Sequence, residues 1–338
     1  MADRYLLAAD VGGTRTSIAL AVAGPLPRIA VQRAYASQDF NSLGDIVADF
    51  VSRPEVAAHY ASIAGACFSV AGPVANNTCT LTNLGWKTDG AVLAREFRLP
   101  AVSLVNDFSA AGLGIAALAP ADIETLQAGQ SIGHGTRLII GAGTGLGVGL
   151  LTWHGDGYHA HASEGGHADF APVDESQDRL LAHLRRTFGR VSYERIVSGP
   201  GLMRIFSFLQ DTGAGVPSKA FQDASNKRSD TAELIAEFAL ARFDPLAVRA
   251  LDLFISVYGA FAGNMALATL ARGGVYISGG IAPKIVGKLK EGAFIRAFTT
   301  KGRFSDLLAA IPVHVVMNTQ SGLLGALLEA ERLAGAGQ

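Results

Sequence analysis

The sequence predicts an α/β protein made of two related halves. Short apolar runs alternate along the chain with longer segments whose apolar residues recur at helical spacing, which is typical of α/β architecture. Two stretches, YLLAADVGGTRTSIALAVAG and RLIIGAGTGLGVGLLTW, each contain a strand, a tight glycine turn and a second strand. When the two stretches are aligned, Gly12 matches Gly143 and Thr14 matches Gly145, which indicates an internal repeat.

The composition indicates a large core and no strongly charged surface. Hydrophobic residues make up 49% of the 338 positions and charged residues 17%, which argues against disorder. A net charge of −1 gives no electrostatic reason to expect nucleic acid or an anionic membrane as a partner. The two cysteines, Cys67 and Cys79, form no CxxC pattern, so neither a disulfide scaffold nor a structural zinc site is expected.

The first residues, MADRYLLAADVGG, contain too short an apolar run for a signal peptide, because Gly12 and Gly13 interrupt it. No apolar stretch of about twenty residues lacks glycine or charge in the way that a membrane-spanning helix does. We therefore expect a cytoplasmic protein that does not bind a membrane.

Apolar runs bounded by turn residues predict further strands, and helical spacing predicts the helices between them. The expected strands are Ile63–Ala71, Ala101–Val105, Gly274–Gly279 and Val313–Met317. The expected helices are Ser42–Val51, Phe108–Leu118, Gln177–Thr187, Pro200–Leu209, Ala232–Arg242, Leu246–Arg272 and Gly322–Leu333. The segment Val313–Leu333 could return to the first half of the fold. The polar stretch Asp211–Asp230 is the best candidate for a loop or lid.

Three common motifs of nucleotide-binding and zinc-binding proteins are absent from the sequence. The Gly287-Lys288 pair is followed by Leu289, so no Walker phosphate loop is present. In GAGTGLG the sixth position is Leu146, and a strand rather than a helix follows, which excludes the dinucleotide fingerprint. No HExxH motif of a zinc protease occurs.

The glycine turns are either ordinary hairpin turns or anion-binding loops. Glycines let backbone N–H groups approach an anion without interference from a Cβ atom. Thr14 and Thr144 would add hydroxyl donors. Asp10, at the edge of the first turn, could hold Mg²⁺ directly or through water, because small hard cations prefer oxygen ligands.

The stretch AVSLVNDFSAAG places Asn106 and Asp107 between an expected buried strand and an expected helix. Asp107 could simply cap the helix, since Asp and Asn favour that position. A carboxylate at such a junction is costly to bury, however, which favours a functional role if other groups require it.

The stretch HASEGGHADFAP forms a loop that brings Glu164 and His167 close together. With Asp169 they could form a metal site, but a polyol site is the better interpretation, because carboxylates accept hydrogen bonds from hydroxyls while imidazole both donates and accepts. Glu194, in SYERIVSGPG, could join that site or form a surface ion pair with Arg195.

Eight motifs together resemble a known family, the bacterial ATP-dependent glucokinases of the hexokinase superfamily. They occur in the family's order from about Leu7 to about Ala326: DVGGT, SVAGPV, TNLGW, VNDFSAAG, GAGTGLG, SEGGHADFAP, ERIVSGPGL and GGVYISGGIAPK. The chain is less similar to the zinc-containing repressor-and-kinase family, because the cysteine-rich motif of that family is absent.

The resemblance implies an actin-like ATPase fold of the ribonuclease H-like type, with two α/β domains flanking a deep cleft. It implies a small domain of residues 1–116 plus 312–338 and a large domain of residues 117–311. It also implies a homodimer that uses ATP and Mg²⁺ to convert glucose to glucose 6-phosphate, without nucleic acid as a partner.

The resemblance assigns a role to each site residue. Asp107 would be the catalytic base. The sugar would contact Asn106, Asp107, Glu164, His167, Glu194, Asn83 and Gly72. The nucleotide would contact Asp10, Gly12, Gly13, Thr14, Gly143, Thr144, Gly145, Gly279 and Gly280, with Asp10 holding Mg²⁺ through water. The chain departs from the family pattern at Arg15, where the family often has Asn after GGT, and the role of Arg15 stays open.

Two alternatives remain beside glucose phosphorylation. One is a kinase of the same fold that acts on mannose, fructose or an amino sugar. The other is a non-catalytic sugar sensor that regulates transcription, which the slightly negative net charge disfavours.

Overall fold

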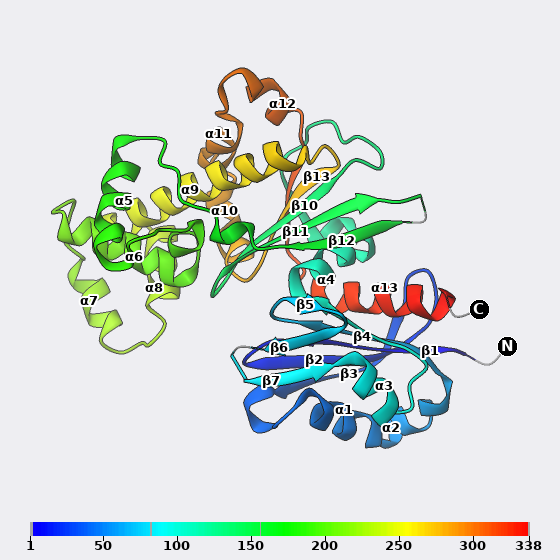
Figure 1. Ribbon diagram of the computed structural model, residues 1–338. Helices are drawn as coiled ribbons and strands as arrows, with labels where there is room; N and C mark the ends of the chain where they lie inside the picture. The colour runs from blue at the N-terminus through cyan, green and yellow to red at the C-terminus, as the bar shows by residue number, and fades with distance from the viewer. Residues whose placement is uncertain (1–2, 82, 156, 337–338) are drawn as a thin grey trace. The chain divides into compact units, whose positions relative to one another are not determined.

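The computed structural model describes residues 3–81, 83–155 and 157–336, and the chain divides into two compact units (Figure 1). The first unit comprises Met1–Pro120, His154–Ala162 and Asn318–Gln338. The second comprises Ala121–Trp153 and Ser163–Met317. The actin-like, mixed α/β fold class predicted from the sequence is confirmed by the solved structures that the chain resembles, which are compared below.

The first unit contains a five-stranded sheet in the order β3-β2-β1-β4-β8. Its strands are β1 (Tyr5–Val11), β2 (Arg15–Val22), β3 (Arg28–Ala36), β4 (Ile63–Val70) and β8 (Val102–Asn106). Strands β1 and β2 pair antiparallel around the first glycine turn, as predicted. Strands β1, β4 and β8 run parallel, so their carboxyl ends meet at one edge of the sheet. Ligands of open α/β sheets bind at such an edge.

Helices cover both faces of this sheet (Figure 1). They are α1 (Leu43–Ser52), α2 (Pro54–Ala57), α3 (Gly90–Glu96), α4 (Asp107–Gly114) and α13 (Ser321–Ala336). Alternate residues of β1 enter two different cores: Leu7 packs in the cluster that contains Phe50 of α1, and Leu6 packs in the cluster that contains Leu327 of α13. Burial on both faces explains why β1 is a continuous apolar run rather than an alternating one.

A small antiparallel sheet completes the first unit. Its strands are β5 (Val74–Ala75), β6 (Thr78–Leu81) and β7 (Trp86–Asp89). The sequence analysis predicted none of these strands, because each is too short to show a period.

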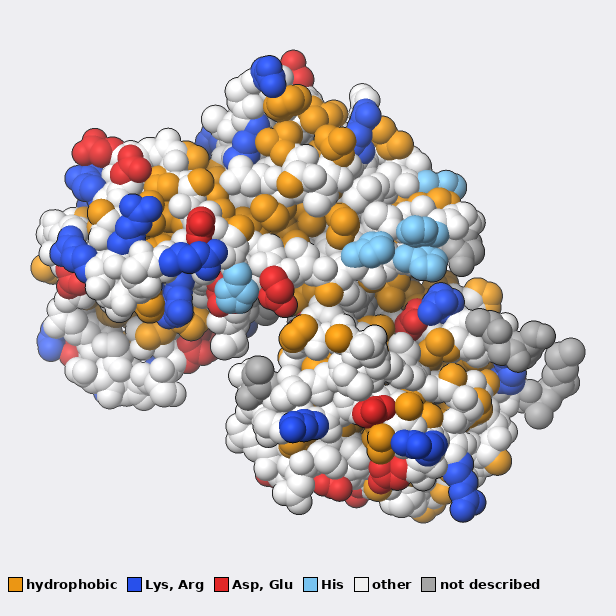
Figure 2. All heavy atoms as spheres, in the orientation of Figure 1, with side chains coloured by type: hydrophobic (Ala, Val, Ile, Leu, Met, Phe, Trp, Pro, Cys, Tyr) orange, Lys and Arg blue, Asp and Glu red, His pale blue; other side chains and the backbone are white. Residues whose placement is uncertain are grey.

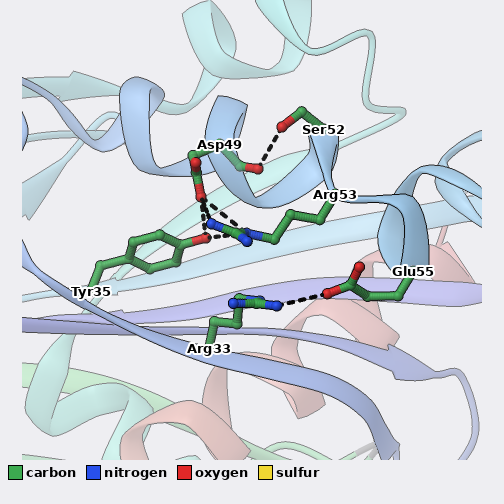
Figure 3. A network of polar contacts seen from close by, with 6 residues as sticks. All are labelled: Arg33, Tyr35, Asp49, Ser52, Arg53 and Glu55. Carbon is green, nitrogen blue, oxygen red and sulfur yellow. Dashed lines mark hydrogen bonds and ion pairs between the residues drawn. The ribbon is translucent and has the colours of Figure 1, made fainter.

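The edge strand β3 was also missed, because polar residues interrupt its apolar positions. Its side chains meet those of α1 and α2 in a polar network (Figure 3). Arg33 pairs with Glu55 at 3.0 Å, and the Tyr35 hydroxyl donates to Asp49 at 2.6 Å. Arg53 also binds Asp49, at 2.7 Å. Charged side chains of this kind discourage an edge strand from pairing with another chain.

A six-stranded sheet has the order β12-β11-β10-β13-β14-β9, and all of its strands except most of β12 belong to the second unit. The strands of this sheet are β9 (Ile123–Gln127), β10 (Arg137–Ala142), β11 (Leu146–Trp153), β12 (Tyr158–Ser163), β13 (Gly274–Ser278) and β14 (Val313–Val316). Strands β10 and β11 form an antiparallel hairpin around the second glycine turn, and β10 pairs parallel with β13. This pairing repeats that of β2, β1 and β4, which supports the predicted internal repeat.

A body of helices packs on this sheet. The helices are α5 (Glu175–Phe188), α6 (Gly199–Asp211), α7 (Lys219–Ser225), α8 (Thr231–Leu240), α9 (Pro245–Thr269), α10 (Val286–Leu289), α11 (Ala293–Thr299) and α12 (Ser305–Ala309). Within the described residues, α9 alone is long and apolar enough to cross a membrane, and 72% of its most apolar window is buried. It is therefore the central core helix of this unit.

Two glycines let α9 approach α11 closely. A Cβ atom at Gly259 would lie 2.2 Å from the Phe294 carbonyl oxygen, and one at Gly263 would lie 2.4 Å from the Phe298 carbonyl oxygen. Such glycines cost helix propensity, and close packing offsets that cost.

The expectation that Asp211–Asp230 forms a loop or lid was wrong over its second half, because the segment contains α7. Ser218 caps this helix by accepting from the Phe221 N–H at 3.2 Å, and the Phe221 side chain is buried. The helix is anchored by this single buried aromatic residue. The residues around it are polar, so the sequence shows no helical periodicity of apolar residues there.

The contact between α4 and α13 generates a test of the fold. A Cβ atom at Gly325 would lie 1.7 Å from the Ala110 carbonyl oxygen, so Gly325→Ala must push the helices apart. We expect the free energy of unfolding to fall by about 1–3 kcal/mol, measured by denaturant titration. Gly335→Ala, in the same helix with nothing within 4 Å of its Cβ position, is the control and should not destabilise the protein. Equal stability of the two variants would contradict this packing argument.

Candidate functional site

The first unit holds a carboxylate at the junction of β8 and α4. The side chain of Asn106, the last residue of β8, accepts hydrogen bonds from the N–H groups of Phe108 at 3.0 Å and Ser109 at 3.3 Å. Asn106 is therefore the residue that caps α4, and the interpretation of Asp107 as the cap was wrong. Asp107 is instead the first residue of the helix, with its carboxylate accepting from the Asn106 side-chain amide at 2.9 Å.

The environment of Asp107 raises the pKa of its carboxyl group to about 6. Burial is the main cause, because desolvation disfavours the charged form, and the nearby negative charge of Asp10 acts in the same direction. Hydrogen bonds from the Phe108 N–H and the Asn106 amide oppose the increase. A carboxylate with this pKa is ionised at neutral pH and is a stronger base than an exposed aspartate.

Asp10 lies at the carboxyl end of β1 and is the second carboxylate of this unit's site. Its Oδ1 atom accepts from the Ser69 hydroxyl at 2.8 Å, and burial raises its pKa. A Cβ atom at Gly322, in the first turn of α13, would lie 3.0 Å from this carboxylate, so the glycine allows the helix terminus to approach it.

Buried hydroxyls support the first glycine turn from beneath. The Ser37 hydroxyl donates to the Gly12 carbonyl oxygen at 2.8 Å and lies 2.9 Å from the Thr16 hydroxyl. A Cβ atom at Gly13 would lie 3.1 Å from the Cβ atom of Asn83, so these two predicted site residues are neighbours. The sequence analysis missed the supporting hydroxyls, because nothing local distinguishes them from other Ser and Thr residues.

Gly72 also joins this group, since its carbonyl oxygen accepts from the Asn106 amide at 3.1 Å. We call this set the first half-site. It consists of Asp10, Gly12, Gly13, Thr14, Gly72, Asn83, Asn106 and Asp107. Its chemistry combines two half-buried carboxylates with an amide and a turn rich in backbone N–H groups.

In the second unit, Glu194 connects the glycine turn to the Glu164–His167 loop. Its Oε2 atom accepts from the Leu146 N–H at 3.0 Å, and a Cβ atom at Gly145 would lie 2.7 Å from the same oxygen. Its Oε1 atom lies 3.9 Å from Nε2 of His167. Glycine at position 145 therefore allows the carboxylate to lie directly beside the turn.

Arg195 does not form the surface ion pair with Glu194 that the sequence left open. Its guanidinium instead lies over the Phe188 ring, 4.3 Å from the centroid. The Glu194 side chain is 30% exposed and faces the His167 ring, so it is available to a ligand.

The Glu164–His167 loop folds as a single 3₁₀ turn, Gly165–His167. The His167 N–H donates to the Glu164 carbonyl oxygen at 2.9 Å. A Cβ atom at Gly166 would lie 1.9 Å from the Leu146 carbonyl oxygen, so this glycine lets the loop pack on β11. Both polar side chains are exposed, and the His167 ring lies beside Glu194.

A metal centre at this loop is not supported, because Asp169 pairs with Arg190 at 2.6 Å. Elsewhere, some of the histidine side chains on the face drawn in Figure 2 lie next to one another, while others lie apart. The His154 ring lies 4.7 Å from that of His159 and 6.2 Å from that of His161. Across residues 3–81, 83–155 and 157–336, no three His, Cys, Asp or Glu side chains are arranged to hold a metal ion.

The second glycine turn opens onto a cavity of about 580 Å³. Its lining includes Gly143, Thr144 and Gly280, together with residues 229–233 at the start of α8. Gly279 has φ +84°, and a Cβ atom there would lie 2.5 Å from the Ala142 carbonyl oxygen, so only glycine fits beside β10. The volume is in the range of small-molecule and cofactor sites.

We call the polar groups of this unit the second half-site. It consists of Gly143, Thr144, Gly145, Glu164, His167, Glu194, Gly279 and Gly280. Its chemistry combines a glycine turn and a cavity with two carboxylates and an imidazole. The sequence analysis did not predict the wall of the cavity formed by α8, because that helix carries no recognisable motif.

Comparisons with known proteins agree with this chemistry. The profile of the glucokinase family matches residues 7–333. Glucokinase from Nostoc sp. is 43% identical over 97% of this chain and 99% of its own length. The crystal structure of glucokinase from an Antarctic psychrotroph covers 97% of this chain and 99% of its own, with a TM-score of 0.84 and 28% identity.

A more distant structure shares the fold. The ROK family glucokinase from Streptomyces griseus, solved in complex with glucose and AMPPNP, has a TM-score of 0.61 and 19% identity over 97% of this chain and 99% of its own. The match of the family profile and the identity with the Nostoc sp. protein extend over nearly the whole sequence. The chain therefore belongs to the glucokinase family.

Proposed function

We propose that this chain transfers the γ-phosphoryl group of ATP to the 6-hydroxyl of glucose. The observation that carries this proposal is Asp107, a half-buried carboxylate that lies next to the amide of Asn106 and whose pKa is raised to about 6. A base for a sugar hydroxyl must be ionised at neutral pH and positioned rigidly, and the strand-to-helix junction meets both requirements.

In the proposed reaction the Asp107 carboxylate accepts the proton of the 6-hydroxyl as its oxygen forms a bond to the γ-phosphorus. The bond between that phosphorus and the bridging oxygen of ADP breaks, so that the products are glucose 6-phosphate, ADP and a protonated Asp107. Phosphoryl transfer leaves the protein mainly positioning and charge stabilisation.

The remaining polar side chains are proposed to hold the sugar. Their residues are Asn83, Asn106, Glu164, His167 and Glu194, with the backbone of Gly72. Carboxylates accept from sugar hydroxyls, and amide and imidazole groups can donate or accept. A sugar without a matching hydroxyl would leave these groups unpaired, which is the strongest source of discrimination.

The two glycine turns are proposed to hold the phosphates. Gly12, Gly13 and Thr14 would contact them from the first unit, and Gly143, Thr144 and Gly145 from the second. The carboxylate of Asp10 fits a role near Mg²⁺, because it is an oxygen donor that the Ser69 hydroxyl holds in place at the end of β1. Bound Mg²⁺ would supply neutralisation of the phosphate charge.

The cavity beside Gly279 and Gly280 is proposed to bind the adenosine. Its lining is mostly apolar, with Lys284 and Glu233 at its edge, so a flat heterocyclic base could bury its faces there. We further propose a cytoplasmic homodimer.

A panel of sugars tests the choice of acceptor. Purified protein is incubated with ATP and glucose, mannose, fructose or an amino sugar, and ADP formation is measured. We expect the highest kcat/KM with glucose. Strong activity with another hexose and none with glucose would overturn the proposal for the substrate while retaining the kinase.

Replacement of the proposed base should separate activity from stability. We expect Asp107→Asn to lower kcat by about 10²–10⁴-fold, since that is the usual contribution of a positioned base. Asp39→Asn, which changes an exposed carboxylate of the same unit, is the matched control and should retain full activity. Steady-state assays with glucose and ATP provide the measurement, and an active Asp107→Asn enzyme would refute the base assignment.

The same variant should be more stable than the wild type at neutral pH. Because the pKa of Asp107 rises from 3.8 to about 6 on folding, the folded state disfavours the ionised form, and wild-type stability falls as pH rises between these values. We expect Asp107→Asn to gain roughly 1–3 kcal/mol above about pH 7 and nothing below about pH 4. Urea titrations across this pH range measure the difference, and a pH-independent difference would contradict the argument.

A substitution in the cavity tests the adenosine site. Gly280 has nothing within 4 Å of its Cβ position and lines the cavity, so the side chain of Gly280→Val would occupy it without distorting the backbone. We expect the KM for ATP to rise about tenfold or more, equivalent to about 1.4 kcal/mol, with the KM for glucose unchanged. Gly287→Val, at a position equally free of neighbours but away from the cavity, serves as control. An unchanged KM for ATP would place the adenosine elsewhere.

A further inference from the structure

The strand that carries the proposed base is an edge strand. In the order β3-β2-β1-β4-β8, strand β8 pairs with β4 on one side only. The backbone groups on the other side of an edge strand have no partner in the sheet. Strand β8 ends at Asn106, and Asp107 follows it directly, so any displacement of this strand would also displace the Asp107 carboxylate.

The side chain of Asn77 binds the outer edge of β8. Its Nδ2 atom donates to the Val102 carbonyl oxygen at 2.9 Å, and its Oδ1 atom accepts from the Leu104 N–H at 2.7 Å. The Val102 carbonyl and the Leu104 N–H flank a single residue of the strand. In a parallel sheet, one residue of the adjacent strand would bind this same carbonyl and N–H pair. The amide thus substitutes for a missing sixth strand, since it carries a donor and an acceptor as a peptide group does.

The fold holds this amide in a fixed position. Asn76 and Asn77 form the turn between β5 and β6, with φ values of 50° and 59°, a conformation that suits Asn and Gly. The Gly90 N–H donates to the Asn77 carbonyl oxygen at 3.0 Å. A Cβ atom at Gly90 would lie 2.3 Å from Nδ2 of Asn77, so the amide fills space that only glycine leaves open.

The same segment binds β8 a second time, near its end. The Asn106 amide donates to the Gly72 carbonyl oxygen at 3.1 Å. Residues 72–77 therefore hold β8 at its start through Asn77 and at its last residue through Gly72. Both contacts lie in the first unit, and neither involves the first glycine turn.

We propose that Asn77 is a positioning residue that fixes strand β8, and through it Asp107, by completing the hydrogen bonding of the strand's open edge. This inference rests on the proposed function, because it assigns a use to the position of Asp107. A misplacement of about 1 Å at a reacting group can cost up to about a hundredfold in rate, so a modest loosening of β8 would be measurable.

The test uses two glycine substitutions in one turn. Asn77→Gly keeps the left-handed backbone and removes the amide, whereas Asn76→Gly makes the same chemical change at a neighbouring position with the same conformation. No hydrogen bond from the Asn76 side chain to β8 is present in the described part of the chain. Any effect of the turn itself or of the unfolded chain is therefore shared by both variants.

We expect Asn77→Gly to lower kcat/KM for glucose about tenfold while the KM for ATP stays within about twofold of wild type. The acid limb of the pH profile should move to lower pH, because a loosened strand end would hydrate Asp107 and lower its pKa. Asn76→Gly should match the wild type in both measurements. A purely structural role would lower the melting temperature and leave the acid limb in place, and that outcome would overturn the proposal.

Hydrogen exchange gives a readout that does not depend on activity. The Leu104 N–H, which the Asn77 side chain protects, should exchange faster in Asn77→Gly than in Asn76→Gly. Gly90→Ala, which displaces the amide without removing it, should change exchange in the same direction, even if Asn77→Gly folds poorly. Unchanged exchange at Leu104 in both variants would also overturn the proposal. An inactive wild type, or an active Asp107→Asn, would instead refute the proposed function, so the two failures are distinguishable.

Discussion

The burial of Asp107 is the constraint on which the rest of the first unit depends. A carboxylate at this junction is desolvated and lies near the charge of Asp10, and both effects raise its pKa, to about 6. Desolvation of Asp107 costs free energy of folding. For the proposed role as a base, the carboxylate must also stay in place and remain ionised at neutral pH. Asn106 meets that need twice, because it caps α4 with its oxygen and donates to Asp107 with its nitrogen.

In both units, glycine residues allow polar groups and backbone segments to approach one another closely. Gly322 lets a helix terminus reach Asp10, and Gly145 lets Glu194 lie beside the second glycine turn. Gly90 makes room for the amide of Asn77. In each case the missing Cβ atom allows a polar group to reach a backbone or a carboxylate that a larger residue would block. The glycine-rich composition therefore serves the placement of polar groups as much as the formation of turns.

Most core elements could be predicted, because their signal is local. The apolar run of β1 and the long apolar face of α9 are visible in the sequence, and the observed elements lie within a few residues of those expected. Strand β3 was not predicted, since its polar residues bind Asp49 and Glu55, which are not its neighbours in the sequence. Helix α7 was not predicted, because its single buried residue, Phe221, does not produce a recognisable helical periodicity.

The sequence by itself determined the two glycine hairpins, because turn chemistry and periodicity depend on neighbours along the chain. The order of its motifs also gave the resemblance to the glucokinase family. Only the tertiary structure decided which residue caps α4, that Glu194 lies against Leu146 rather than Arg195, and that Asn77 completes the edge of β8. It also decided the pKa of Asp107. Desolvation, charge and edge pairing depend on groups distant in sequence, and folding alone brings them together.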